Sequence, residues 1–463
     1  MNRDSQEFVI GSSSLTSEAT LGDWEGIRDL PENWKTTQLG AVATLSSKPP
    51  HLALGSDAVV PFIPMHLVPQ DGSAITRWEL RRPPEVRSGV YFCDGDVLVA
   101  KITPCLENGK QGVARKIPGG WGYASTEIYP IHPNTGIDTD FVAAYLRLTA
   151  VRTYLMHRME GTTGRKRLPK TVLMSLPIPL PPLPEQRAIA RVLRTVQEAK
   201  EATEKVIAAT RELKKSLMRH LFTYGPVPLD QVDQVPLKET EIGLVPEAWE
   251  VQPLRDCAKV QTGIAKGRKI SDAEAVDVPY LRVANVQDGY LNLAEIKTIR
   301  IARSEIPRYQ LIPGDVLVTE GGDMDKLGRG FLWQGQVSGA VHQNHVFAIR
   351  ADTNALLPEY LAYFVQSSVS KSYFLNVAHR TTHLACINST KLKALPTVLP
   401  SLPEQRDVVQ YLRAVDSKIE AEESWARTLD SLFNSLLHNL MTGRIRVPAT
   451  WADGYPAEGV VDA

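Results

Sequence analysis

The chain has 463 residues, and its 52 Lys and Arg residues balance 52 Asp and Glu residues, so the formal net charge is zero. A chain of this length exceeds one ordinary hydrophobic core and predicts two or more domains. The neutral balance excludes a protein coated uniformly in positive charge, while it permits local basic patches. The cysteines form no CxxC pair, which favours a reducing compartment; they are Cys93, Cys105, Cys257 and Cys386.

Residues 1–29 are predicted to form a flexible arm. Their first part, MNRDSQEFVIGSSSLTSEAT, has no apolar block long enough for a signal peptide. No uninterrupted apolar run in the sequence reaches the roughly 18 residues of a membrane-spanning helix. We therefore expect a cytoplasmic protein with no membrane partner.

Two similar phrases indicate an internal duplication. PLPPLPEQ begins at Pro179 and PSLPEQ begins at Pro400, and their shared LPEQ segments lie 219 residues apart. GDVLVAK at Gly95 and GDVLVTE at Gly314 have the same offset. Farther upstream the offset drifts by a few residues, as insertions in loops would cause. The sequence therefore predicts two copies of one unit of about 200 residues.

Each copy has the same internal order. Short apolar and β-branched runs broken by Gly, Pro, Asn and Asp predict mixed strands and turns. One short helix is expected near residues 141–154 of the first copy and near 358–370 of the second. The predicted boundaries are globular domains over 30–182 and 244–401, long helices over 183–223 and 402–443, a linker over 224–243 and a tail over 444–463.

The prolines before the first long helix predict a stiff, extended spacer, because proline fixes φ and prevents helix. The helix is expected to begin after Pro184, which places Glu185 in its first turn, where a carboxylate favours the helix dipole. Glu404 has the same place in the second copy. The repeated phrase is thus predicted to fix how each domain is mounted on its helix.

The second long helix has the 4,3 apolar spacing of a coiled coil, and the first is looser. Ordinary amphipathic helices packed on their own domains would give a similar pattern, but the duplication favours pairing of the two helices. The regular heptads also predict that a fragment of residues 244–443 dimerises through its own helix. The predicted seam residues are Ile189, Leu193, Val196, Leu213, Leu217, Leu412, Val415, Ile419, Leu429, Phe433 and Leu436.

Catalytic motifs are scarce in this sequence. It has no phosphate loop, nucleophile elbow, HExxH or Asn-Pro-Pro-aromatic motif of adenine methyltransferases. Asp277, Glu295 and Lys297 have the loose spacing of a metal-dependent nuclease, which leaves a stand-alone DNA nuclease as the alternative function. The stretch HRTTHLAC at 379–386 has spacings that could hold zinc, but a fourth ligand and a matching set in the first copy are missing.

Two basic clusters are more informative. Between Arg152 and Lys170 the chain carries six basic residues and one acid, a local net charge of +5. The second cluster is Lys259, Lys266, Arg268 and Lys269. Either cluster alone is typical of solvated surface. Beside polar loops such as ENGKQG at 107–112 and VHQNH at 341–345, they indicate phosphate contacts next to base-reading residues.

The duplicated set of motifs closely resembles the specificity subunit of Type I restriction-modification systems. Each copy has GDVLV, a Thr-Thr loop and the LPEQ phrase before a long helix, and the resemblance covers roughly residues 30–443. It implies an α+β fold in which two duplicated mixed α/β target recognition domains are separated by two long antiparallel helices. The resemblance implies that these helices form a coiled coil with pseudo-two-fold symmetry.

The resemblance implies a non-catalytic subunit whose two domains each bind one half of a bipartite target in double-stranded DNA. It implies no cofactor in this chain. Two methyltransferase subunits would dock on the scaffold and bring S-adenosylmethionine, and restriction or motor subunits would use ATP and magnesium. Adenine methylation needs base flipping and catalytic groups that this chain lacks. At about 1.5 Å per residue, the first long helix predicts half-sites centred about one DNA turn or more apart.

By position in the family, the DNA-facing loops follow Val99 and Val318 and surround the Thr pairs. Together with the basic clusters, they give for the first domain Lys101, Thr103, Asn108, Lys110, Gln111, Thr162, Thr163, Arg165, Lys166 and Arg167. For the second domain they give Lys266, Arg268, Lys269, Arg329, His342, Gln343, Asn344, Arg380, Thr381, Thr382 and His383. The family's Thr-Thr loop often continues with glutamine, where this chain has Gly164 and His383, so single base contacts do not transfer.

Overall fold

A computed structural model gives the structure of the protein and describes residues 30–52, 55, 58–86, 88–162, 164–267, 270–322, 327–380 and 385–452. The chain forms two compact units: unit 1 joins Met1–Glu204 to Ser424–Ala463, and unit 2 is Lys205–Glu423. The boundary before Ser424 follows the boundary before Lys205 by 219 residues, the offset of the sequence repeat. The predicted arm 1–29 and residues 453–463 of the predicted tail lie outside the described residues.

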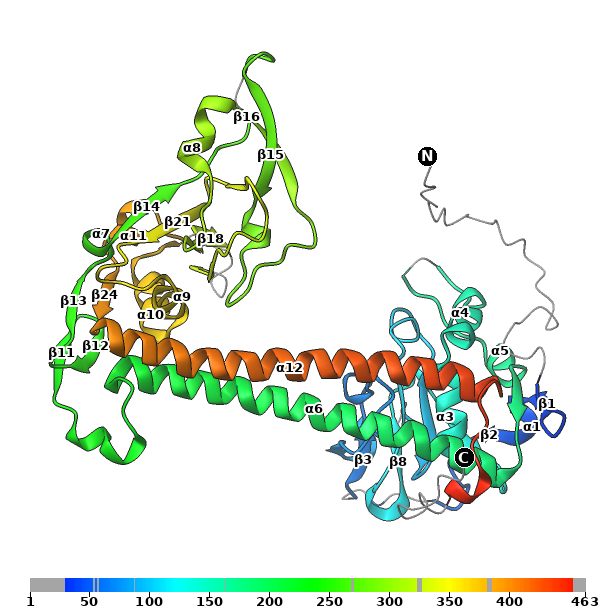
Figure 1. Cartoon of the computed structure of the whole chain (residues 1–463). Coiled ribbons are helices and arrows are strands. Elements are labelled where there is room, and N and C mark those ends of the chain that lie inside the picture. Colours follow the sequence, from blue (N-terminus) through cyan, green and yellow to red (C-terminus); the bar gives the residue numbers. More distant parts are fainter. Residues whose placement is uncertain are drawn as a thin grey trace, which may run out of the picture. The chain divides into compact units, whose positions relative to one another are not determined.

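In the described part of unit 1, the strands form two four-stranded sheets and one separate pair (Figure 1). The first sheet has the order β2 (Ala43–Leu45), β9 (Ile128–Pro133), β6 (Val97–Ala100) and β7 (Gln111–Val113). The second has the order β4 (Glu79–Arg81), β3 (Val60–Ile63), β8 (Trp121–Ala124) and β5 (Val90–Cys93). The pair is β1 (Lys35–Gln38) with β10 (Pro177–Leu180). The shorter helices are α1 (Leu39–Val42), α2 (Pro83–Val86), α3 (Thr139–Arg147), α4 (Thr149–His157) and α5 (Lys170–Met174).

Unit 2 repeats this plan. The sheet β14 (Ala258–Thr262), β21 (Val346–Ala351), β17 (Val316–Thr319) and β19 (Gly330–Leu332) matches the first sheet of unit 1 strand for strand. The sheet β16 (Lys297–Ala302), β15 (Ala275–Leu281) and β20 (Val341–His342) matches β4, β3 and β8, and β13 (Glu250–Pro253) pairs with β24 (Pro396–Leu399). Additional strands are β11 (Leu237–Thr240), β12 (Gly243–Pro246), β18 (Gly321–Gly322), β22 (His379–Arg380) and β23 (Ala385–Cys386). The shorter helices are α7 (Leu254–Cys257), α8 (Ile306–Tyr309), α9 (Pro358–Gln366), α10 (Ser368–Val377) and α11 (Ser389–Lys393). The repeated order confirms the predicted duplication and the α+β class.

The single short helix predicted in each copy is in fact two consecutive helices. In unit 1, Asp138 caps α3 by accepting a hydrogen bond from the Phe141 N–H, and the chain turns at Leu148 before α4. In unit 2, Ser367 separates α9 from α10, and its side chain caps α10. The boundary was missed because the apolar residues continue through both helices, while the break depends on one residue with extended backbone.

The GDVLV motif is a tight turn followed by a buried strand. Gly95 has φ of +91°, a conformation that favours glycine, and Asp96 accepts a hydrogen bond from the Cys93 N–H to close the turn. Asp96 is fully buried, and burial raises the pKa of its carboxyl despite a contact of 2.7 Å with His132. The equivalent residues in unit 2 are Gly314, Asp315, Ile312 and Arg350.

The proline stretch is a strand, which corrects the prediction of a spacer. Strand β10 pairs antiparallel with β1, from Lys35 opposite Leu180 to Gln38 opposite Pro177. The sequence of β24 in unit 2 is PTVL, and it pairs with β13 in the same way. Proline is tolerated here because the sheet has two strands, so each strand has a free edge where a missing N–H costs nothing.

The LPEQ phrase holds each long helix on its domain through two side chains. Glu185 accepts a hydrogen bond from the Trp34 indole at 3.2 Å, and Gln186 bonds both the Asp138 N–H and the Pro181 carbonyl. Unit 2 repeats the arrangement with Trp249, Glu404, Gln405, Leu357 and Pro400. Burial opposes ionisation of Glu404, but hydrogen bonds from Ser401 and Trp249 outweigh it and lower the pKa of that carboxyl.

The predicted tail also takes part in this mounting. Arg446 donates to Glu185 at 2.5 and 2.8 Å and to Asn33 at 3.1 Å. The helix dipole and the ion pair therefore act on the same carboxylate. The sequence pattern gave no signal for this contact, because Arg446 and Glu185 are 261 residues apart.

The two long helices are α6, Leu183–Tyr224, and α12, Leu402–Met441. Helix α6 begins one residue before Pro184 rather than after it, since proline is favoured in the first turn. In unit 2, Arg211 and Lys214 of α6 contact Glu423 and Asp416 of α12 respectively, so the helices run antiparallel as predicted.

Both helices contribute to the hydrophobic core of each unit. The unit 1 core includes Ile189 and Leu193 from the start of α6 and Phe433 and Leu440 from the end of α12. The unit 2 core includes the opposite ends, with Met218, Leu221, Phe222, Val408 and Leu412. Each unit therefore depends on chain segments from both repeats.

The seam between the helices differs from the prediction in its polarity. Of the predicted residues, Ile189, Leu193, Leu412, Leu429 and Phe433 are buried, and Val196, Leu217, Val415, Ile419 and Leu436 are half-buried. Leu213 is 57% exposed, so it does not belong to the seam. The buried positions near it are Thr203 and Ile207, while Lys214 is covered beside Asp416. The apolar spacing of α6 misplaced Leu213 because its actual contact positions carry polar residues.

Candidate nucleic-acid interface

In unit 1 the structure joins the loop after β6 to the loop that follows α4. The Thr103 N–H donates to the Lys166 carbonyl at 3.0 Å, and the Leu168 N–H donates to the Lys101 carbonyl at 2.8 Å. Ile102 and Arg167 form a β-bridge between these two bonds. Two loops predicted separately to face DNA are thus one continuous surface.

Charged side chains on this surface interact with one another. Arg167 donates to Glu127 at 2.7 and 2.9 Å, and these hydrogen bonds lower the pKa of the Glu127 carboxyl. The Lys101 ammonium lies 4.8 Å from the centre of the Tyr129 ring. Burial lowers the pKa of Lys101, although nearby Glu127 acts in the opposite direction. Arg167 is exposed, but its guanidinium is paired with an acid of its own domain, whereas no described ion pair involves its neighbours Arg165 and Lys166.

The exposed part of the predicted set in unit 1 consists of Asn108, Thr162, Arg165, Lys166 and Arg167. Thr103 is half-buried and donates to Glu107 at 2.8 Å. Among the described ion pairs of this loop, Arg167 has an acidic partner, and Arg165 and Lys166 have none. These two residues therefore supply the positive charge of the exposed loop.

Two predicted residues of unit 1 are removed from the interface. Gln111 is 5% exposed, and its amide donates to the Ala143 carbonyl at 2.8 Å. The Lys110 ammonium donates to the carbonyls of Met65 and Val68. Both side chains therefore hold the loop to the domain. Sequence reasoning missed this because a polar residue beside a strand looks the same whether it points outward or inward.

In unit 2 three segments meet at the end of β17. The Glu320 N–H donates to the His345 carbonyl at 2.9 Å, and the Ile387 N–H donates to the Glu320 carbonyl at 2.8 Å. The His345 ring also contacts the Glu320 carboxylate through Nδ1. His345 ends the loop VHQNH that the sequence analysis singled out, but it was not among the individually predicted residues. Glu320 was not selected, although it stands in GDVLVTE where Lys101 stands in GDVLVAK.

The other described residues of the predicted set in unit 2 contact residues of their own unit. Arg329 is half-buried and donates to Gln287 at 2.6 Å. The Gln343 side chain accepts from the Val283 N–H at 3.3 Å, and the half-buried Asn344 contacts His345. Lys266 is exposed, with its ammonium 5.7 Å from the Tyr280 ring centre.

His342 is removed from the predicted interface because it is fully buried. Its Nδ1 lies 2.6 Å from the Val346 carbonyl, which requires the proton on that nitrogen. Burial lowers the pKa of the ring, so the neutral form is favoured. The ring thereby links the two ends of the loop that contains Gln343 and Asn344.

Some predicted residues lie outside the described part of the chain. They are Thr163, Arg268, Lys269, Thr381, Thr382 and His383. Arg380 belongs to β22, but its side chain is not described. The zinc alternative falls partly on these residues. Among the described residues no group of three or more His, Cys, Asp or Glu side chains could hold a metal ion.

The nuclease alternative is not supported by the geometry of its three residues. Glu295 pairs with Arg282 at 3.0 Å and lies 3.6 Å from Lys297. Asp277 is opposite Arg300 in the β15–β16 ladder, while Lys297 is opposite Tyr280. Three residues of a strand span about 10 Å, so the aspartate and the lysine do not meet.

In the described residues, no helix is both long and apolar enough to cross a membrane.

The fold and these surfaces define a duplicated binding scaffold, in which two α+β units each present joined polar loops and share two long helices. The family of Type I restriction modification DNA specificity domains matches residues 31–210 and 246–426, and the chain belongs to this family.

Similar proteins and structures agree with this membership. The type I restriction enzyme MjaVIII specificity subunit of Methanocaldococcus jannaschii is 25% identical over 71% of this chain and 76% of its own length. The EcoEI specificity subunit of Escherichia coli is 31% identical, but the match covers 35% of this chain and 27% of that protein. A crystal structure of a Type-I restriction-modification system S subunit from M. genitalium covers 89% of this chain and 96% of its own, with 13% identity and a TM-score of 0.51, which shows a shared fold.

Proposed function

We propose that this chain is the non-catalytic DNA-recognition subunit of a type I restriction-modification enzyme, and that each unit reads one half of a bipartite target. The carrying observation is that equivalent loops have different chemistry in the two units. At the end of β6, unit 1 has Lys101, Glu127 and Arg167. At the end of the equivalent strand β17, unit 2 has Glu320 and His345. Cationic and carboxylate side chains suit different base edges in the major groove. Two different half-sites require such a difference.

The partners in this proposal are two methyltransferase subunits and the restriction subunits. Methylation would use S-adenosylmethionine, and translocation and cleavage would use ATP and magnesium, all in the partner subunits. The helices support two equivalent docking faces. Val206 and Leu213 of α6 are 40% and 57% exposed, and Trp425 and Leu432 of α12 are 52% and 43% exposed. These pairs stand 219 residues apart, so each repeat carries the same exposed apolar face.

A footprint of the chain assembled with its methyltransferase tests the function. We expect two protected DNA segments separated by an unprotected gap, with centres about one helical turn or more apart. Replacing Glu320 with Lys should alter the sequence preference of one segment and leave the other unchanged. A single contiguous footprint, or plasmid cleavage by the chain alone with magnesium, would contradict the proposal and favour the nuclease.

The salt dependence of DNA binding distinguishes the roles of the neighbouring basic residues of unit 1. Replacing Arg165 and Lys166 with Ala should reduce the slope of log K against log salt by up to about 1.8, because each phosphate contact contributes about 0.9. Arg167→Ala should change this slope less, because Glu127 already holds that guanidinium. Binding titrations at several salt concentrations measure both. Equal slopes for all variants and the parent would assign the pair to ordinary solvated surface.

A further inference from the structure

The ion pairs between the two long helices all have one polarity. In the described part of the chain, α6 supplies the base and α12 supplies the acid in each pair. The pairs are Lys200 with Asp430 at 2.7 Å in unit 1, and Lys214 with Asp416 at 2.7 Å and Arg211 with Glu423 at 2.6 Å in unit 2.

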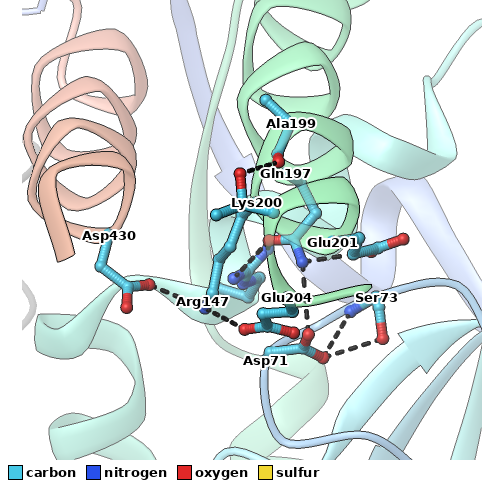
Figure 2. A network of polar contacts seen from close by, with 10 residues as sticks. Asp71, Ser73, Arg147, Gln197, Ala199, Lys200, Glu201, Glu204 and Asp430 are labelled. Atoms are coloured by element: carbon cyan, nitrogen blue, oxygen red, sulfur yellow. Dashed lines mark hydrogen bonds and ion pairs between the residues drawn. The ribbon is translucent and has the colours of Figure 1, made fainter. Parts of the chain in front are cut away.

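Two of these pairs have a largely covered lysine in the seam. The Lys200 and Lys214 side chains are only 15% and 17% exposed, so each ammonium group is largely covered beside its acid. Figure 2 shows Asp430 of α12 pointing at Lys200 of α6. Gln197 and Thr203 are buried polar residues of α6 on either side of Lys200. Because two of the three cations are largely covered, their charges have more influence on which helix can be the partner than fully solvated charges would have.

The repeat makes alternative pairings easy to specify. Two helices that are equivalent by duplication could each pair with a copy of itself from a second chain, in the same antiparallel register. Asp430 stands 219 residues after Arg211, so the two residues occupy equivalent positions with opposite charge. In the same way, Ile419 is equivalent to Lys200 and Phe433 to Lys214. The helices are therefore equivalent in position but not in charge.

We propose that these residues form a charge code by which α6 accepts only α12 as its partner, and that the code opposes pairing of either helix with a copy of itself. The proposal concerns assembly and does not depend on whether the chain reads DNA. It reverses the expectation, drawn from the heptads alone, that a fragment of residues 244–443 dimerises through its own helix.

A like pair is two copies of α6 or two copies of α12, and an unlike pair is α6 with α12. Replacing each residue of one helix by its equivalent in the repeat shows which ion pairs a like pair would lose. In a pair of α12 helices, Asp430 would face Glu423 and Ile419, and Asp416 would face Phe433. In a pair of α6 helices, Lys200 would face Arg211. One attraction, between Arg211 and Glu204, would form in the α6 pair. Exposed ion pairs each shift an equilibrium by about 1.4- to 5-fold, so the loss of all three from both chains decides the outcome although no single pair does.

The test begins with the complete folded chain and opens its linker. A specific protease site is inserted between Asp230 and Gln231, which are exposed. After cleavage, preparations with different tags are mixed and equilibrated, and native mass spectrometry counts the pairs of halves. We expect halves from different preparations to exchange but to form only unlike pairs. Like pairs in the proportions of random pairing would overturn the proposal.

Charge reversal gives the second arm. Asp430→Lys puts two bases opposite each other in the unlike pair and creates an attraction to Glu423 in the α12 pair, so pairs of C-terminal halves, which we expect to be absent from the parent, should appear. Adding Lys200→Glu should restore the unlike pair. Asp407→Lys is the matched control, because Asp407 is an exposed acid of α12 outside the described ion pairs, and it should leave the distribution unchanged.

A double-mutant cycle on the uncut chain keeps the proposal testable if a single variant folds poorly. Lys200→Glu and Asp430→Lys should each lower the thermal midpoint, and the double variant should recover most of the loss. Additive losses in this cycle, or a distribution of halves that ignores the reversal, would show that shape alone selects the partner and would overturn the charge code.

Discussion

Replacing Gln405 with alanine is expected to destabilise unit 2 by about 3 kcal/mol or more, because it leaves three backbone groups without their partner. Gln405 is fully buried. Its carbonyl oxygen accepts from the Leu357 N–H at 2.8 Å, and its amide donates to the carbonyls of Ala355 and Pro400 at 2.8 and 2.9 Å. One side chain thus joins the start of α9, the end of the proline strand and the first turn of α12.

Urea unfolding measures the loss, and hydrogen exchange locates it. The Leu357 amide should exchange much faster in the variant, because its acceptor is gone. Gln410→Ala is the control, since Gln410 is an exposed glutamine on the same helix and should cost little. If both variants unfold at the same urea concentration, Gln405 does not hold the domain on the helix. Gln186→Ala should have a smaller effect in unit 1, where the described amide and carbonyl partners are Asp138 and Pro181.

The duplication could be predicted from the sequence because it depends on identity at a fixed offset and on no tertiary contact. The same offset relates the sheet orders, the GDVLV turns and the boundaries of the two units. The long helices were also predicted closely, with ends at Tyr224 and Met441. Local periodicity and proline position are sufficient for such elements.

The direction of side chains was harder to predict. Leu213 fits the apolar spacing of α6 but is exposed, while Lys214 beside it is covered because Asp416 provides its counter-charge. Gln111 and His342 are polar residues in loops that point into the protein, where Ala143 and Val346 provide hydrogen-bond acceptors. Lys214 and Gln111 depend on partners distant in sequence, and His342 depends on a carbonyl four residues away that it meets only in the folded loop. Neither composition nor spacing contains these contacts.

The exposed apolar faces of the helices give the second large prediction, which rests on the proposed partners. Trp425→Asp with Leu432→Asp should remove one of two bound methyltransferase subunits, and Val206→Asp with Leu213→Asp should remove the other. A charge placed at the centre of an apolar interface weakens binding by about 2–4 kcal/mol, whereas exposed positions cost little in the free chain. Sedimentation with a fixed excess of partner should report one bound copy for either pair and none for all four changes.

Ser431→Asp supplies the control, because Ser431 is an exposed neighbour of Leu432 on α12. It adds the same charge to the same turn without removing apolar surface, so both copies should stay bound. The equivalence of the two faces makes the test selective. The faces arose from one repeat, so the α6 and α12 double variants must each lose a single copy and by a similar factor. Loss of partner from one pair alone would mean that the helices offer a single docking site and that the exposed residues of the other helix have a different role.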